Sequence, residues 1–205
     1  MKFKTLTEVS AILIAFTLAQ PIVAQSTQYG QGLLLDYYVI QNPDDINEPT
    51  GRSMATLVDT SVPHMSYLGP FEIEPALSQF QDKFWGLHWT GHLKSEDAGA
   101  YSFNLLLETS LEPSSSTGLD CVSWLKVQDR AVVTHEYKLF QGPSNNAYGD
   151  IDLREGIYGI EVWLACNRAR YTNIEKTKLE ITPNMRGPND AMLKPIPKNQ
   201  LLHEL

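Results

Sequence analysis

Residues 100–108 read Ala100-Tyr-Ser-Phe-Asn-Leu-Leu-Leu-Glu108, and this stretch decides the fold class. Tyr101, Phe103, Leu105 and Leu107 alternate with Ser102, Asn104, Leu106 and Glu108. Successive side chains of a strand point to opposite faces of a sheet, so such alternation is typical of a strand with one buried face. The stretch therefore predicts a strand that packs on a hydrophobic core.

The same alternation recurs along the chain, and turn signals separate the stretches that carry it. It is clear at 157–165 and 176–182, and further strands are expected at 33–40, 84–94, 121–128 and 131–135. The turn signals lie at 95–99, 141–146 and 154–156. Many short strands separated by turns predict an all-β fold, either an antiparallel β-sandwich or a distorted barrel.

Two connections are long for such a fold, one from 41 to about 81 and one from 111 to 120. Long loops on a rigid sheet are where binding residues usually lie. Near the C-terminus, the pattern of 198–203 favours a final helical turn.

Composition limits the class of protein. The chain has 205 residues, of which 42% are hydrophobic, and a formal net charge of -8. These values fit one globular domain and argue against a nucleic-acid-binding protein, which usually presents a basic surface. Two cysteines are too few for a disulfide-dense small domain or for a four-cysteine zinc site.

The N-terminal segment has the features of an export signal. Lys2 and Lys4 precede an apolar stretch, AILIAFTLA at 11–19, and Ala24 is a small residue at a suitable cleavage position. The apolar stretch is about half as long as a membrane-spanning helix requires. We therefore expect a signal peptide at 1–24, one domain at 25–205, and a secreted, periplasmic or cell-surface protein without a membrane span.

Export determines how the two cysteines are interpreted. An exported chain enters an oxidising compartment, so Cys121 and Cys166 are expected to form a disulfide. The alternative is two buried free thiols.

Several motifs occur in an order that resembles the protective-antigen-type (PA-fourteen) domain family, a β-sandwich family. Gly32-Leu-Leu-Leu-Asp-Tyr-Tyr38 is similar to the opening strand, and Phe84-Trp-Gly-Leu-His-Trp-Thr-Gly-His-Leu-Lys94 to the Phe-x-x-x-Trp-x-Gly element. The later motifs are Glu96-Asp-Ala-Gly-Ala-Tyr-Ser-Phe103, Leu125-Lys-Val-Gln-Asp-Arg-Ala-Val-Val133, Leu153-Arg-Glu-Gly-Ile-Tyr-Gly-Ile-Glu-Val162 and Ile196-Pro-Lys-Asn-Gln-Leu201. At Gln128-Asp129 the family usually has Asp-Gly, and the departure suggests a different turn type.

The resemblance implies a site for carbohydrate. Many members bind sugar through a calcium ion held by two adjacent Asp residues, with an Asn on a second loop. Here Glu108, Thr109 and Ser110 stand where Asp-Asp-Gly would stand, and Asn167 falls near the family's Asn. Glu108 and Asn167 are therefore the candidate metal ligands, and Ca²⁺ is the one cofactor that the resemblance suggests.

The site also departs from the family. Only one carboxylate remains of the usual pair, which removes charge and an oxygen ligand and so weakens calcium binding. Glu112 or Asp120 could add an oxygen, and the simpler reading of Glu108 is a solvated strand end. Calcium dependence is accordingly doubtful.

The second loop carries further candidate ligand contacts at Arg168, Arg170 and Tyr171, which are residue types that often anchor interfaces. A solvated loop is the alternative. A Cys121–Cys166 bridge would tie the two candidate binding loops together at one end of the sheet, although ordinary stapling of neighbouring strands is equally compatible.

Two other arrangements carry less weight. His88 and His92 are spaced like zinc ligands on a helix, but in a strand four residues span about 13 Å, which is too far for one ion. Trp85, Leu87, Trp89 and Leu93 occupy the opposite face and are interpreted as core. Asp150 and Asp152 could form an acid–base pair of the kind that glycosidases use, but recognition is the favoured function.

Together these features favour an exported, non-enzymatic recognition domain that binds carbohydrate and acts like an adhesin at the cell surface. Its ligand would be a glycan or a surface protein. The alternative is a structural or assembly subunit of a surface appendage or of a secreted complex.

Overall fold

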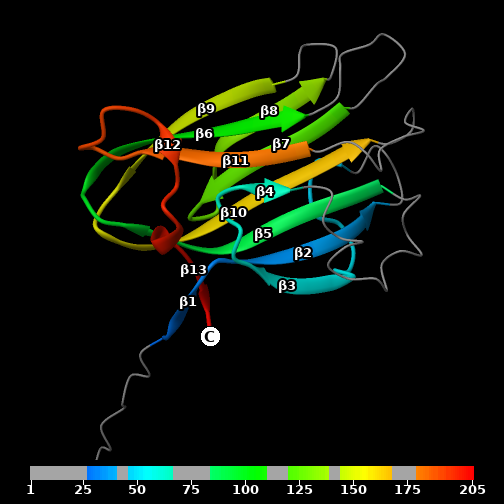
Figure 1. Cartoon of the computed structure of the whole chain (residues 1–205), viewed down its shortest axis with the longest axis horizontal. Helices are drawn as coiled ribbons and strands as arrows, with labels where there is room; N and C mark the ends of the chain where they lie inside the picture. The colour runs from blue at the N-terminus through cyan, green and yellow to red at the C-terminus, as the bar shows by residue number, and fades with distance from the viewer. Residues whose placement is uncertain (1–26, 41–45, 67–83, 110–119, 139–143, 168–178) are drawn as a thin grey trace, which may run out of the picture.

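The computed structural model describes residues 27–40, 46–66, 84–109, 120–138, 144–167 and 179–205. In these residues the chain forms two antiparallel sheets, of eight and five strands, which lie over one another (Figure 1). The prediction of an antiparallel β-sandwich is confirmed, and the sheets are not closed into a barrel. The expected signal peptide at 1–24 lies outside the described residues. Among the residues described, no helix has the length and apolar character needed to cross a membrane.

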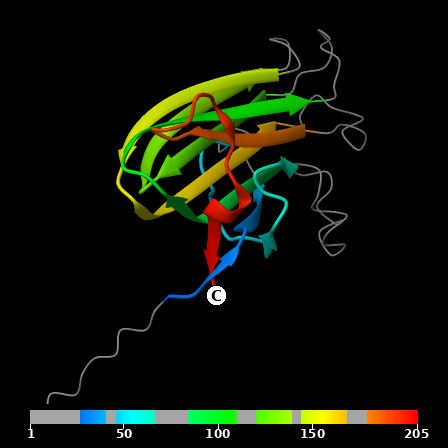
Figure 2. The ribbon, with the colours of Figure 1, turned by 60° about the vertical axis from the view of Figure 1, so that its left-hand side comes forward.

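The strands of each sheet come from distant parts of the chain. In the larger sheet the order is β1 (Tyr29–Gln31), β13 (Leu201–Glu204), β5 (Phe84–Ser95), β10 (Gly156–Asn167), β7 (Asp120–Val127) and β8 (Arg130–Lys138), with β2 (Leu33–Ile40) beside β5 and β3 (Ala55–Asp59) beside β2. In the smaller sheet the order is β12 (Lys194–Pro195), β11 (Leu179–Arg186), β6 (Gly99–Thr109) and β9 (Ser144–Leu153), with β4 (Met65–Ser66) beside β11. A short 3-10 helix, η5 (Lys198–Gln200), precedes β13. Figure 2 shows the first and last strands side by side at one edge.

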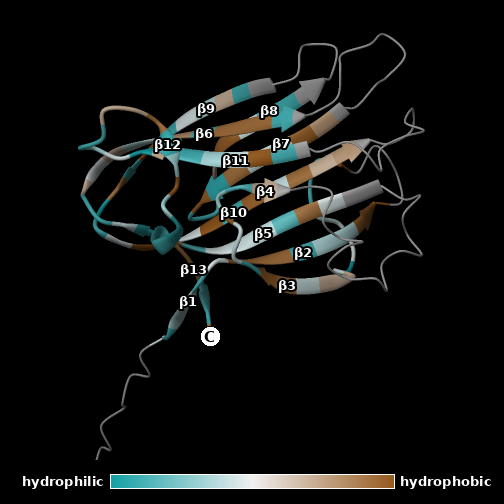
Figure 3. Cartoon of the chain, viewed as in Figure 1, coloured by the Kyte–Doolittle hydropathy of each residue, from teal (hydrophilic) through white to brown (hydrophobic). Residues whose placement is uncertain are grey.

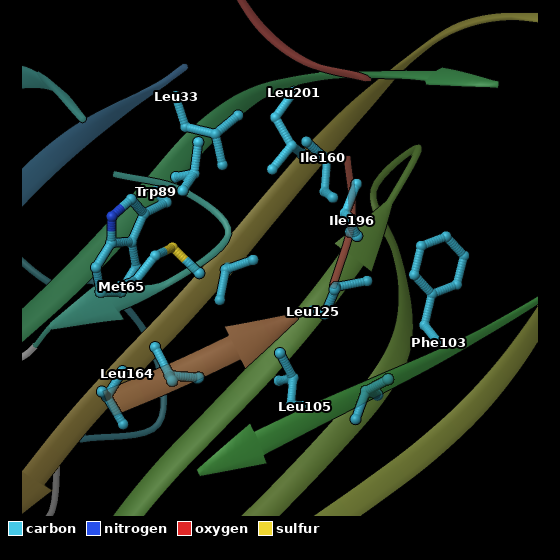
Figure 4. Packing of buried hydrophobic residues seen from close by; sticks show 14 of the residues in the cluster. Leu33, Met65, Trp89, Phe103, Leu105, Leu125, Ile160, Leu164, Ile196 and Leu201 are labelled. Atoms are coloured by element: carbon cyan, nitrogen blue, oxygen red, sulfur yellow. The ribbon is translucent and has the colours of Figure 1, made fainter. Parts of the chain in front are cut away.

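The core lies between the two sheets. Tyr101, Phe103, Leu105 and Leu107 of β6 are all at most 3% exposed, as their alternation predicted. They pack with residues of the larger sheet such as Trp89, and Figure 4 shows several members of this cluster. Figure 3 shows hydrophobic and polar residues alternating along the strands, as expected for strands with one buried face.

Three expectations about the elements are wrong, and a fourth element is found with other bounds. The connection expected at 41–81 contains β3 and β4, and β9 begins at Ser144, inside the stretch that reads as a turn. The helical turn expected at 198–203 ends at Gln200, because Leu201 and the residues after it pair with β1 and β5. The strand expected at 176–182 is β11, which runs from Leu179 to Arg186.

The turn between β7 and β8 differs from expectation as well. Gln128 and Asp129 have φ values of 53° and 59°. Two-residue hairpins of type I′ require positive φ at both central positions, and Asp-Gly is a favoured pair there. The chain therefore makes the kind of turn that Asp-Gly makes, with two residues that adopt this conformation less readily.

Candidate functional site

The candidate site lies at the end of the sandwich where β6 and β10 finish. Asp120, the first residue of β7, pairs with Asn167, the last residue of β10. Leu179, the first residue of β11, pairs with Thr109, the last residue of β6, so β7 and β11 both begin at this end. We call this the loop end; it lies to the right in Figure 1. The strand ends that flank 110–119 and 168–178 thus meet at one end of the molecule, although both of those segments lie outside the described residues.

A disulfide fixes two of these strand ends. Cys121 and Cys166 are directly opposite each other on β7 and β10, and their sulfur atoms are 2.07 Å apart. Both side chains are buried against the core, at 2% and 0% exposed. The expected disulfide is confirmed. It joins neighbouring strands of one sheet, one residue inward from Asp120 and Asn167.

Glu108 lies at the loop end on the outer face of the smaller sheet. Leu107 beside it is fully buried, whereas Glu108 is exposed. Glu108 is directly opposite Ser144 on β9 and Glu180 on β11. The strand position therefore brings a second carboxylate to the candidate site.

Sequence reasoning did not assign Glu180 to this site. The alternation of its stretch placed Glu180 on the polar face of a strand, but only the pairing register shows that it lies opposite Glu108. Like charges directly opposite on adjacent strands destabilise a sheet. Glu108 and Glu180 are therefore two acidic residues at paired positions on the outer face, near the loop end.

The described residues do not by themselves fit a calcium ion. Glu108 ends a strand of the smaller sheet, whereas Asn167 ends a strand of the larger one. No group of three or more His, Cys, Asp or Glu side chains within the described ranges could hold a metal ion. Calcium takes about six to eight oxygen ligands, so a site here would need main-chain, amide or water oxygens in addition to carboxylates. Arg168, Arg170 and Tyr171 lie outside the described residues.

The outer face of the larger sheet carries a cluster of aromatic side chains. The rings of Trp124 and Trp163 stack with centroids 6.4 Å apart, and His88 contacts both edge-on at 5.6 and 6.1 Å. The two indole N–H groups donate to the main-chain oxygens of Asn47 and Ile46, at 2.9 and 2.8 Å. Because Trp124 and Trp163 are at most 5% exposed, this cluster is a second small core and offers no open stacking platform.

His88 also contacts a charged residue in this cluster. Its Nε2 lies 2.9 Å from Glu161 Oε2. Burial lowers the pKa of His88, and the hydrogen bond to Glu161 opposes that change. His92 instead lies 3.2 Å from Glu204, so the two histidines have different partners. This arrangement agrees with the rejection of a zinc site.

The two remaining candidate carboxylates, Asp150 and Asp152, are exposed on β9 on either side of the buried Ile151. They share a face of the strand, as the alternation predicted. Their proposed acid–base role stays a hypothesis.

Comparison of the sequence gives no match to a protein-family model and no match to a curated protein. Comparison of the structure does give matches. The PA14 domain of the antifreeze protein MpAFP is 12% identical, with a TM-score of 0.53, and the match covers 88% of this chain and 94% of that one. The PA14 sugar-binding domain from an RTX adhesin is 16% identical, with a TM-score of 0.51, and coverages of 84% and 98%. The chain has the fold of PA14 domains.

The structure also matches an adhesin domain and part of a longer protein. The A domain of epithelial adhesin 9 from Candida glabrata, in complex with Galb1-4GlcNAc, is 10% identical, with a TM-score of 0.52 and coverages of 86% and 90%. The match to an anti-sigma factor domain-containing protein, 14% identical with a TM-score of 0.52, covers 84% of this chain but only 48% of that one. At these identities the comparisons establish the PA14 fold, as the sequence motifs implied.

Proposed function

We propose that this protein is an exported, non-enzymatic carbohydrate-binding domain that acts like an adhesin at a cell surface. The observation that carries the proposal is the PA14 fold, because structures with this fold include a sugar-binding domain of an adhesin and an adhesin domain in complex with a disaccharide. A fold alone does not determine function, so the proposal also depends on the chemistry of the loop end.

The proposed sugar contacts are Glu108 and Glu180 on the smaller sheet, Thr109 and Asn167 at the strand ends, and Arg168, Arg170 and Tyr171 beyond β10. Carboxylates accept hydrogen bonds from sugar hydroxyl groups, and Arg and Asn can donate to ring and hydroxyl oxygens. No step in this binding requires a metal ion. The disulfide would hold the ends of β7 and β10 in place before binding, which lowers the entropy lost when a ligand is ordered.

Export is supported by the disulfide, because disulfides persist in oxidising compartments and are rare in the cytosol. A secreted, periplasmic or cell-surface location follows from the same reasoning. The signal peptide at 1–24 and the single domain at 25–205 remain predictions.

A glycan array tests the proposed function. The protein is applied in calcium chloride and separately in a chelator, beside the variants Glu108→Gln and Glu180→Gln. Asp152→Asn serves as the matched control, because it removes an equal charge from β9 where that strand pairs with the start of β6. We expect binding in both conditions that weakens in the two glutamine variants and persists in the control.

Absence of binding in both conditions would overturn the proposal. Binding that occurs in calcium chloride but is lost in the chelator would instead show that the site requires calcium. The assembly-subunit alternative makes a different prediction, since a stoichiometric protein partner from the native envelope, without any sugar affinity, would favour that alternative.

A further inference from the structure

The outer face of the smaller sheet has a polar floor that hydrogen bonds hold in place. Asn184 on β11 donates through Nδ2 to Asn104 Oδ1 on β6 at 2.9 Å. Asn104 Nδ2 in turn donates to Asn146 Oδ1 and to Ala147 O on β9, both at 3.1 Å. Asn104 and Asn184 are only 4% and 9% exposed. This chain of amides links three neighbouring strands, which lie side by side in Figure 1, and fixes the position of Asn146.

An exposed aromatic ring stands beside this floor. Tyr148 on β9 lies directly opposite Asn104, on the same face of the sheet. It is 65% exposed, and among the described residues it is the only aromatic side chain in the set of strongly exposed large hydrophobic ones. The face of a tyrosine ring is apolar and carries partial negative charge, so it can stack on the C–H groups of a sugar ring, which carry partial positive charge. Tyr148 therefore offers the open stacking surface that the buried Trp124 and Trp163 do not.

The part of this face between Glu108 and Tyr148 carries uncharged side chains. Leu106 on β6 is half-buried and lies directly opposite Asn146, which is exposed. A side-chain amide has two N–H donors and a carbonyl with two lone pairs, so Asn146 can bond hydroxyl groups of a ligand while its Oδ1 also accepts from the polar floor. An apolar surface therefore lies next to a hydrogen-bonding group. A sugar ring presents the same two kinds of surface, C–H groups and hydroxyl groups.

The pairing register gives the length of this part of the face. Glu108 and Asn104 are four residues apart on β6, which corresponds to about 13 Å along a strand. Tyr148 pairs with Asn104, and Asn146 pairs with Leu106, so Glu108, Asn146 and Tyr148 mark successive rows of outward-facing side chains. A pyranose ring is about as wide as the spacing between adjacent strands, roughly 5 Å. One ring therefore cannot reach from Glu108 to Tyr148, whereas three linked rings can.

The charges on this face favour a neutral sugar. Glu108 and Glu180 lie opposite each other where the face begins, and the chain has a formal net charge of -8. In the rows from Glu108 to Tyr148, the described residues of β6, β9 and β11 include no Lys or Arg. Arg186 lies beyond Tyr148, where it donates to Ser102 Oγ at 2.9 Å. Because like charges placed together weaken binding, a sugar that carries a carboxylate is disfavoured here.

We infer that the sugar site extends from Glu108 along the outer face of the smaller sheet to Tyr148, and that its ligand is a neutral oligosaccharide of at least three units. One ring bonds to the carboxylates near the loop end, the next packs on Leu106 and bonds to Asn146, and the third stacks on Tyr148. This inference rests on the proposed carbohydrate-binding function and adds the size and the charge of the ligand.

A glycan array that carries neutral and sialylated glycans of one to six units tests this inference. The full chain is compared with its variants Tyr148→Ala and Tyr148→Phe, and dissociation constants for the best ligand are then measured by calorimetry. We expect the best ligands to be neutral glycans of three or more units. Tyr148→Ala should weaken their binding about tenfold, because it removes the ring on which the third unit stacks. Tyr148→Phe keeps this ring and should bind like the wild-type protein.

Two controls separate stacking on Tyr148 from general effects. Met192→Ala removes a side chain that is 70% exposed, as Tyr148 is to a similar degree, but that lies in the turn between β11 and β12, so it should not change binding. In NMR titrations of the ¹⁵N-labelled protein, the best ligand should shift the backbone amide signals of Glu108, Asn146 and Tyr148. Urea unfolding of each variant confirms that it folds.

Failure of this inference can be told apart from failure of the proposed function. If no glycan binds, both are overturned. If disaccharides bind as tightly as longer glycans, or if Tyr148→Ala binds like the wild-type protein, the extended site is overturned and the carbohydrate-binding function stands. If sialylated glycans bind more tightly than neutral ones, the neutral ligand is overturned.

Discussion

The disulfide gives the most quantitative prediction. Cys121→Ala together with Cys166→Ala removes a cross-link that closes a loop of 45 residues. In the chain-entropy model a loop of this length stabilises the folded state by about 4 kcal/mol, because it restricts the unfolded chain. Both sulfurs are buried, so alanine at these positions also loses packing. We expect the free energy of unfolding to fall by about 4 kcal/mol or slightly more.

Urea unfolding followed by circular dichroism and tryptophan fluorescence measures this change. For a domain of this size each kcal/mol shifts the melting temperature by about 2–4 °C, so the double variant should melt about 8–16 °C lower. Its m-value should rise, because an unfolded chain without a cross-link exposes more surface. The wild-type protein unfolded in a reductant serves as the control and should resemble the double variant.

A loss below about 1 kcal/mol would refute the reasoning, since it would mean that the cross-link hardly restricts the unfolded chain. If the folded double variant binds glycan with unchanged affinity, the disulfide stabilises the pairing of β7 with β10 and does not contribute to ligand binding.

Three further predictions concern single residues. Asp129→Gly should raise the free energy of unfolding in urea by about 0.5–1 kcal/mol, because φ is 59° there and glycine adopts this conformation without a steric cost; no gain would contradict the turn assignment. Gly86→Ala should lower that free energy by about 1–3 kcal/mol, because a Cβ at this position would lie 2.0 Å from the Trp163 ring; a neutral result would mean that the ring can move away. Burial lowers the pKa of His88, so the unfolded chain takes up its proton first and stability should fall as the pH drops below about 6.5. Urea unfolding at about pH 7.5 and pH 5.5 should show a smaller difference for His88→Asn, and an equal difference would show that His88 does not contribute.

Much of the fold can be predicted from local pattern. The alternation around Tyr101 to Leu107 identifies β6 to within one residue at each end, and the expected strand at 33–40 coincides with β2. Both strands have one face in the core, so the sequence period directly reflects burial. Exported chains tend to pair their cysteines, and this predicted the bridge.

Other elements could not be predicted because distant partners determine them. Ser144 to Asn146 favour a turn locally, yet β9 begins there because it pairs with β6 along its whole length. Leu201 to His203 form a strand because β1 and β5 supply neighbours from far along the chain.

The candidate site shows the same limit. The sequence identified Glu108 as a lone carboxylate, and only the pairing of β11 with β6 places Glu180 opposite it.

The pairing of the first and last strands has a practical consequence. Tyr29 lies opposite Glu204, and β13 joins β5 at Leu93 and His92, toward the end of β5 that is remote from the loop end. Leu205 is 80% exposed. A tether attached after Leu205 would therefore leave the molecule from the sheet edge formed by β1 and β13, and not from the ends of β6 and β10 that carry the proposed sugar contacts. The domain could be anchored to a bead, a sensor chip or a cell wall and still display those contacts to the surrounding medium.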